Sequence, residues 1–169
     1  MNSYKASAGL RIGHVHLHVS DLKRSIAFYR DLLGFDLHAE LPDLAFLSAG
    51  GYHHHIGLNT WGTKGAEQDG KRRPGLYHFA LNYPTKAEFA AAVRNLVQAG
   101  HPIDGASDHQ THLAIYLSDP DGNGIELAWD RDPSHWRAFM TEKDPAKLRA
   151  ISKPLDAAAL LEEREPANM

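Results

Sequence analysis

The sequence contains no cysteine, so disulfides and thiolate ligands are excluded and any metal would be held by nitrogen and oxygen donors. It has no apolar run of about 18 residues and no basic, apolar leader, from which we expect a soluble, cytoplasmic protein that does not cross a membrane. The formal net charge is -3, and the only basic cluster is Lys71-Arg72-Arg73. This charge balance argues against a nucleic-acid partner.

Histidine, in contrast, is abundant. The chain has 12 histidines among 169 residues, and three of them, His53, His54 and His55, are consecutive. Hydrophobic residues make up 43% of the chain, which is ordinary for a globular protein and sufficient for a core. Because imidazoles bind metals and exchange protons near neutral pH, the histidines direct the search for a functional site.

A weak internal duplication aligns His14 with His78, Leu17 with Leu81 and Arg30 with Arg94. Each copy begins with a strand and a helix and continues with three strand-like segments, a βαβββ order. The first copy predicts strands at 12–19, 36–41, 45–48 and 52–60 and a helix at 22–33. The second copy predicts strands at 77–83, 102–106, 112–118 and 124–129 and a helix that begins at the Thr85–Glu88 capping box and runs through Leu96 to Gly100.

We therefore predict an α+β fold in which two modules, residues 10–60 and 75–130, pair into one curved mixed sheet that forms a cup. Residues 10–131 would form a single domain, with the polar stretch 61–74 linking the modules. Residues 132–169 are predicted to be a helical C-terminal extension with a helix at 156–163. This extension is expected either to cover the sheet or a partner subunit, or to be a partly disordered terminus.

Residues 119–124, DPDGNG, followed by Asp130 have the spacing of a calcium-binding loop. Such a loop lies between two helices, whereas residues 111–118 alternate apolar and polar side chains as a strand does. Asp-Gly and Asn-Gly favour a tight hairpin turn instead. The turn makes Glu126 the first charged residue of the last strand, where a carboxylate between apolar neighbours is costly to bury unless it is paired or binds a metal.

Two histidines and this glutamate form a candidate metal site. His14 and His78 are equivalent by the repeat, and Glu126 lies on the last strand of the second copy. Two imidazoles and one carboxylate on separate strands suit Fe(II) or Mn(II) and leave about three of six coordination positions open. Either histidine alone would more often be a core residue bonded to the backbone, and their symmetric placement favours the metal.

Three stretches, GHVHLHVSDLKRSIAFYRDLLGF, LYHFAL and IYLSDPDGNGIELAW, resemble the vicinal oxygen chelate (glyoxalase/bleomycin resistance/extradiol dioxygenase) superfamily. The resemblance covers residues 11 to 131 and is closest to single-domain members similar to catechol 2,3-dioxygenase. It implies that His14, His78 and Glu126 are the metal ligands. It also implies Fe(II) as the metal, with Mn(II) or Zn(II) as alternatives, and a homodimer.

A possible fourth ligand separates branches of this superfamily. Matching residues 56–58 with residues 125–127 places Gly57 where the glyoxalase I scheme has a glutamate. Glycine has no side chain that could coordinate a metal. The resemblance therefore favours a three-ligand site, which leaves room for two substrate oxygens and O2.

The resemblance to metal-dependent extradiol dioxygenases also implies catalytic residues: an acid–base histidine at His54 and a tyrosine at Tyr116. An imidazole can take a catechol proton and return one near neutral pH, and Tyr116 could donate a hydrogen bond to developing charge or simply pack within its strand. Strict strand alternation would turn His55 rather than His54 inward, so His55 is a rival that could contact substrate. His109 and His112 are also expected to contact substrate.

We therefore expect an Fe(II)-dependent extradiol-type dioxygenase that acts on a catechol-like aromatic diol with O2. Two alternatives stay open. The first is another metal-dependent superfamily member, a glyoxalase-like isomerase or a thiol transferase. The second is a binding or drug-sequestering protein without a catalytic metal, in which the cup holds a small aromatic ligand against Trp61 or Trp129.

Overall fold

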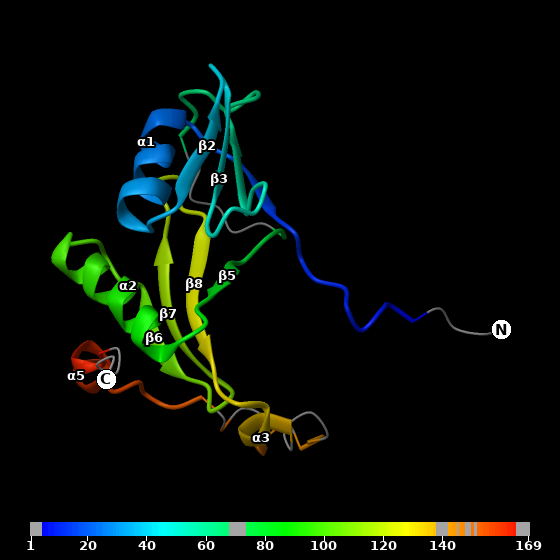
Figure 1. The fold of residues 1–169 in the computed structure, drawn as a ribbon, viewed down its shortest axis with the longest axis vertical. Coiled ribbons are helices and arrows are strands. Elements are labelled where there is room, and N and C mark those ends of the chain that lie inside the picture. The colour runs from blue at the N-terminus through cyan, green and yellow to red at the C-terminus, as the bar shows by residue number, and fades with distance from the viewer. Residues whose placement is uncertain are drawn as a thin grey trace. The chain divides into compact units, whose positions relative to one another are not determined.

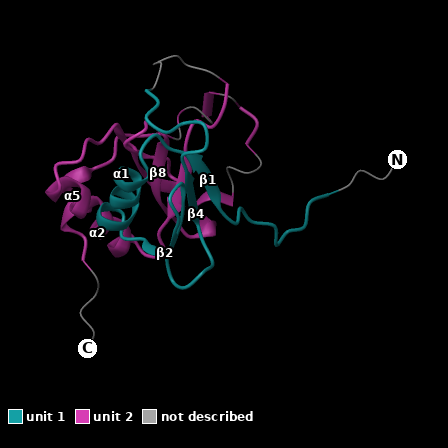
Figure 2. Ribbon diagram, turned by 90° about the horizontal axis from the view of Figure 1, so that it is seen from above, with its two compact units in different colours: residues 1–67 teal, residues 68–169 magenta. Residues whose placement is uncertain are grey.

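The computed structural model describes residues 5–67, 74–137, 142–144, 146–147, 150 and 152–164 (Figure 1). Two compact units divide the chain, unit 1 at residues 1–67 and unit 2 at residues 68–169 (Figure 2). The basic triplet at 71–73 and the central part of the predicted linker lie outside the described residues. Within the described part of the chain, no helix is both long and apolar enough to cross a membrane.

Unit 1 is built on a four-stranded mixed sheet with the strand order β1-β4-β3-β2. Its elements are β1 (Val15–His18), α1 (Leu22–Ala27), the π-helical segment η1 (Phe28–Leu32), β2 (Asp36–Glu40), β3 (Leu44–Ser48) and β4 (Ile56–Asn59). Strand β1 runs parallel to β4, and the other neighbours are antiparallel. Asp21 caps α1 by accepting a hydrogen bond from Arg24 N, and Gly34 adopts a φ of +79° just after η1.

The two faces of the β1 strand differ in burial, as alternation requires. Leu17 is 5% exposed and belongs to the core of unit 1, together with Leu58 of β4 and Tyr29 of η1. His16 and His18 are exposed on the other face of the strand. The predicted alternation of β1 is therefore confirmed, and it separates the core from a histidine-bearing face.

Unit 2 repeats this architecture with the strand order β5-β8-β7-β6 and β5 parallel to β8. Its elements are β5 (Phe79–Asn82), α2 (Lys86–Gln98), β6 (Gly105–Asp108), β7 (His112–Ser118), β8 (Gly124–Asp130), α3 (Pro133–Trp136) and α5 (Ala157–Glu162). The predicted βαβββ repeat is confirmed, because each unit has its own four-stranded mixed sheet with the same strand order.

Helix α2 stabilises the sheet of unit 2 from one side. Both hydrogen bonds of the predicted Thr85–Glu88 capping box are present. The helix buries an apolar face that includes Phe89, and it contacts β8 on one side and α5 on the other. The helix predicted at 156–163 is thus present as α5 and packs on α2, where the Lys86 ammonium lies 2.6 Å from a Glu163 carboxylate oxygen.

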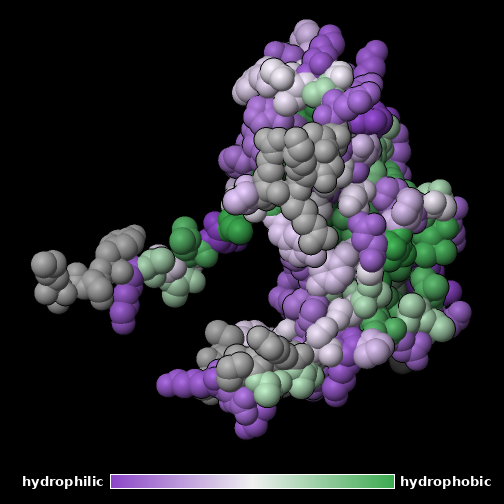
Figure 3. Space-filling model, turned by 180° about the vertical axis from the view of Figure 1, so that it is seen from behind, coloured by the Kyte–Doolittle hydropathy of each residue, from purple (hydrophilic) through white to green (hydrophobic). Residues whose placement is uncertain are grey.

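Several strand boundaries differ from the predictions. Strand β4 begins only at Ile56, so the histidine triplet precedes the strand instead of lying within it. The strand predicted at 102–106 is found at Gly105–Asp108. Its backbone pairing with β7 begins only at Gly105, which lies opposite Tyr116. The chain leading into β1 is an extended arm that carries apolar surface (Figure 3). Two of its residues, Leu10 and Ile12, are 74% and 87% exposed.

Candidate metal centre

The turn between β7 and β8 sets the position of the candidate ligand Glu126 within unit 2. Asp119 is 5% exposed, and its carboxylate accepts hydrogen bonds from the backbone N–H groups of Asp121 and Asn123 and from the Asn123 side-chain amide. Gly122 adopts a φ of +77° in the same turn. The predicted hairpin turn is confirmed, and the Asp119 carboxylate is engaged in forming it.

Gly124 allows the chain segment before β5 to lie against β8. A Cβ atom at this position would be 2.3 Å from the Tyr77 carbonyl oxygen and 3.1 Å from the His78 Cβ atom. A side chain would therefore collide with backbone. The glycine permits the close approach that brings His78 to Glu126, two residues further along β8, and sequence reasoning did not identify this role.

Glu126 is 6% exposed, and an imidazole lies at each of its carboxylate oxygens. The Nε2 atom of His78 is 2.9 Å from Oε2, and the Nε2 atom of His112 is 2.9 Å from Oε1. Burial raises the pKa of the Glu126 carboxyl, but the hydrogen bond from His112 and the charges of His112 and His78 outweigh burial and lower the pKa overall. Glu126 is thus a buried, paired carboxylate.

Tyr116 and His109 lie beside this pair. The Tyr116 hydroxyl is 2.7 Å from His109 Nε2, and the rings of Tyr116 and His78 have centroids 5.6 Å apart. Tyr116, His78 and Gly124 line a cavity of about 270 Å³. Burial, followed by the charge of Glu126, raises the pKa of Tyr116, so its hydroxyl keeps its proton. Burial lowers the pKa of His109, which favours a neutral ring.

In unit 1, the histidines of the triplet 53–55 have different contacts. The ring of His54 lies against His14, with centroids 4.4 Å apart, and against Phe46, with centroids 4.6 Å apart. His55 is turned elsewhere, because its Nδ1 atom lies 2.9 Å from the Ser48 hydroxyl. Burial, followed by the charges of His14 and His53, lowers the pKa of His54. His54, and not His55, therefore lies beside the candidate ligand His14.

A ring fills the space beside Gly57. His16 is paired with Gly57 across β1 and β4, and a Cβ atom on Gly57 would be 2.9 Å from the His16 ring. In unit 2, the corresponding strand pair places Ala80 opposite Glu126. In unit 1 the larger side chain of this pair, His16, is on the first strand, whereas in unit 2 the larger side chain, Glu126, is on the last strand. The sequence showed that Gly57 cannot be a ligand, but not that His16 occupies the vacated volume.

Unit 2 contains two of the three predicted metal ligands, His78 and Glu126, close together. His78 and Glu126 offer one imidazole nitrogen and one carboxylate oxygen that converge to 2.9 Å, which is the nitrogen and oxygen donor chemistry that Fe(II) and Mn(II) accept. The third predicted ligand, His14, belongs to unit 1. Among the described residues, no three His, Asp or Glu side chains surround one point closely enough to hold an ion.

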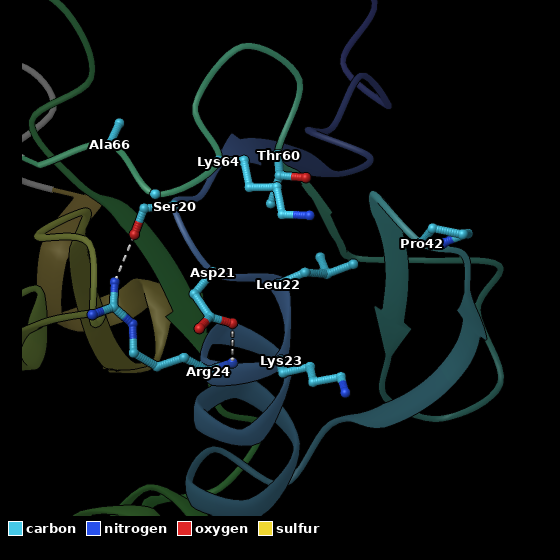
Figure 4. A pocket seen from close by; sticks show the side chains of 10 residues that line it. Ser20, Asp21, Leu22, Lys23, Arg24, Pro42, Thr60, Lys64 and Ala66 are labelled. Atoms are coloured by element: carbon cyan, nitrogen blue, oxygen red, sulfur yellow. Dashed lines mark hydrogen bonds between the residues drawn. The ribbon is translucent and has the colours of Figure 1, made fainter.

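A larger cavity, of about 520 Å³, lies in unit 1 at the start of α1 (Figure 4). Its lining includes Asp21, Lys23, Arg24 and Lys64, but none of the histidines predicted to act in the site. Asp21 accepts a hydrogen bond from Arg24 N, and the Arg24 guanidinium donates to Ser20. These hydrogen bonds stabilise the first turn of α1. The larger cavity shares no lining residue with the candidate metal centre.

Comparisons with known proteins match these motifs. A model of the Glyoxalase/Bleomycin resistance protein/Dioxygenase superfamily matches residues 11–127. A catechol-2,3-dioxygenase of Bacillus subtilis is 40% identical over 111 residues, which are 64% of this chain and 37% of that protein. A lactoylglutathione lyase of Salmonella typhimurium is 30% identical over 136 residues, which are 73% of this chain and 95% of that protein.

A solved structure agrees with the fold. The crystal structure of a glyoxalase/dioxygenase from Nostoc punctiforme superposes with a TM-score of 0.61 at 24% identity, over 78% of this chain and 99% of that chain. The chain spans only 37% of the length of the Bacillus subtilis relative.

Proposed function

The chain belongs to the Glyoxalase/Bleomycin resistance protein/Dioxygenase superfamily, as its motifs predicted, and from this premise we propose that it is an Fe(II)-dependent extradiol-type dioxygenase acting on a catechol-like aromatic diol. One observation carries the proposal: each predicted metal-ligand histidine has a predicted catalytic side chain beside it in its own unit. His14 lies against His54, and His78 lies against Tyr116. The 40% identity to a catechol-2,3-dioxygenase supports the same reaction class.

The proposed ligands are His14, His78 and Glu126. The His78–Glu126 pair supports this assignment within unit 2, and His14 is added by the repeat and by the resemblance. When bound to them, Fe(II) would hold both diol oxygens and O2 in one coordination sphere, and Mn(II) or Zn(II) are the alternative metals. The absence of a side chain at Gly57, whose space His16 occupies, supports three protein ligands instead of four.

The chain's own residues would handle protons and orientation. His54 would accept a proton from the diol and return one, because a neutral imidazole can do both near neutral pH. Tyr116 would donate its hydroxyl hydrogen to substrate oxygen as negative charge develops. His109, bonded to the Tyr116 hydroxyl, would hold that hydroxyl in place, and the cavity lined by His78 and Tyr116 would receive the substrate.

A second candidate is an isomerase of the lactoylglutathione lyase type. The observation that favours it is coverage: the match spans 95% of the Salmonella typhimurium lyase but only 37% of the Bacillus subtilis dioxygenase. Such an enzyme would need no O2 and would work with Zn(II) or Mn(II) in anaerobic solution. The predicted homodimer and cytoplasmic location stay predictions under either candidate.

Oxygen uptake tests the proposal. The metal-free protein is loaded with Fe(II) under anaerobic conditions, mixed with a panel of small catechols, and exposed to oxygen while O2 consumption and the visible absorbance of ring-opened product are recorded. We expect stoichiometric uptake with product. Glu126→Ala should lose both metal retention and uptake, whereas His54→Ala should retain the metal and turn over about 100-fold to 10,000-fold more slowly.

Exposed His135 in α3 provides the matched control, because His135→Ala removes one imidazole outside the proposed site. This variant should behave as the unmodified protein does. Iron-loaded protein that consumes no O2 with any catechol, yet isomerises a thiohemiacetal substrate without oxygen, would replace the dioxygenase by the second candidate.

A further inference from the structure

The two oxygens of the Glu126 carboxylate have different partners. Oε2 faces His78, the proposed metal ligand, and Oε1 faces His112, which has no proposed role toward the metal. His112 was expected to contact substrate. Its 2.9 Å contact with Oε1 instead places it directly behind a proposed ligand.

The sheet register explains how these side chains meet. Tyr116 is paired with Glu126 and His112 with Asp130 across β7 and β8, so His112 and Glu126 share one face of the sheet. The pair between these positions is Ala114 and Ala128. Two methyl groups leave the space in which the imidazole of one strand and the carboxylate of the other reach each other.

The His112 ring is held from its other side as well. The Thr111 hydroxyl lies 2.8 Å from Nδ1, and the His109 ring stacks on His112 with centroids 4.7 Å apart and planes inclined by 31°. When the Thr111 hydroxyl donates to Nδ1, the ring proton is on Nε2, which then donates to Oε1 of Glu126. Both ring nitrogens of His112 thus lie within hydrogen-bonding distance of protein oxygens, Nδ1 at Thr111 and Nε2 at Glu126, which argues for a role behind the ligand.

We propose that His112 is a positioning residue that fixes the Glu126 carboxylate through Oε1 and thereby keeps Oε2 turned toward His78 and the metal. The inference rests on the proposed metal site and assigns it a residue outside the ligand set. A hydrogen bond to a ligating carboxylate restricts its rotation, and loss of such outer partners typically weakens metal affinity about 10-fold to 100-fold. Thr111 and His109 orient the imidazole in turn.

Cobalt(II) binding tests the role without relying on turnover. Metal-free protein is titrated with Co(II) in competition with a chelator, and the visible absorption spectrum of the bound ion is recorded. We expect His112→Ala to weaken Co(II) binding about 10-fold to 100-fold and to alter the spectrum. His112→Gln, whose amide N–H can replace Nε2–H, should recover most of the affinity, and His135→Ala should leave both readouts unchanged.

His112→Gln also guards against a folding artefact, because it lacks the imidazole ring yet can restore the hydrogen bond. Far-ultraviolet circular dichroism and urea midpoints are compared for all variants. Wild-type affinity and spectrum in His112→Ala would overturn the positioning role while leaving the metal site intact. Complete loss of binding that His112→Gln does not restore would overturn it in favour of direct ligation. Failure of the unmodified protein to bind Co(II) would overturn the metal site itself, and this inference with it.

Discussion

Gly124→Ala should damage the candidate metal centre although the substitution adds only one methyl group. The new Cβ atom would be placed 2.3 Å from the Tyr77 carbonyl oxygen, well inside van der Waals contact, and 3.1 Å from His78 Cβ. The nearest obstacle is backbone, so the segment before β5 that carries Tyr77 and His78 must shift away from β8. Overpacking of this kind costs about 1 to 3 kcal/mol, and at about 3 °C per kcal/mol the melting temperature should fall by about 3 to 9 °C.

The same shift would move His78 away from Glu126, so metal affinity should fall together with stability. Urea unfolding and Co(II) competition on the same preparations measure the two effects. Gly105→Ala is the matched control in the same sheet, because its Cβ atom would meet only Tyr116 at 3.6 Å, an ordinary contact. That control should change stability by about 1 kcal/mol or less. Gly124→Ala protein with unchanged stability and metal affinity would refute the close-approach argument.

Three further results are expected. Gly57→Ala should shift the His16 ring resonances in NMR spectra while changing stability by about 1 kcal/mol or less, because the exposed ring can swing away from a Cβ atom 2.9 Å distant; unchanged resonances would contradict this. Thr85→Ala should lower the unfolding free energy in urea by about 1 kcal/mol through loss of the hydrogen bond from Glu88 N, and an unaffected midpoint would count against the cap. Burial raises the pKa of Tyr83 from 10.0 to about 12, so the protonated Tyr83 side chain should contribute fully to stability below pH 10 and lose this contribution as the pH rises toward 12. The expected loss is about 2 to 3 kcal/mol, and Tyr83→Phe should abolish this pH dependence.

The repeat and the motifs predicted much of the fold because period-2 alternation and capping are local signals. The strand face bearing His16, the Thr85–Glu88 capping box and the turn at Asp119 were all readable from short stretches of sequence. Element ends were less predictable. The apolar residues of β4 begin at Ile56, and the chain before them bends, which the residue pattern of the predicted strand did not indicate.

The candidate site was predictable in its residue types but not in its contacts. The parity objection to His54 assumed that the triplet lies within a strand, and it loses its basis because His54 precedes β4. The contact of His112 with Glu126 depends on strand register and on two intervening alanines, which only the paired sheet reveals. The need for glycine at Gly124 likewise depends on a neighbour distant in sequence, the backbone at Tyr77.

Isotope incorporation is the most direct test of the central claim. Iron-loaded protein and a catechol that supports turnover are exposed to heavy-isotope O2, and the product is analysed by mass spectrometry. The account predicts that both atoms of O2 appear in a ring-opened product and that Glu126→Ala forms none. A product without labelled oxygen, or product formation that Glu126→Ala leaves intact, would contradict it.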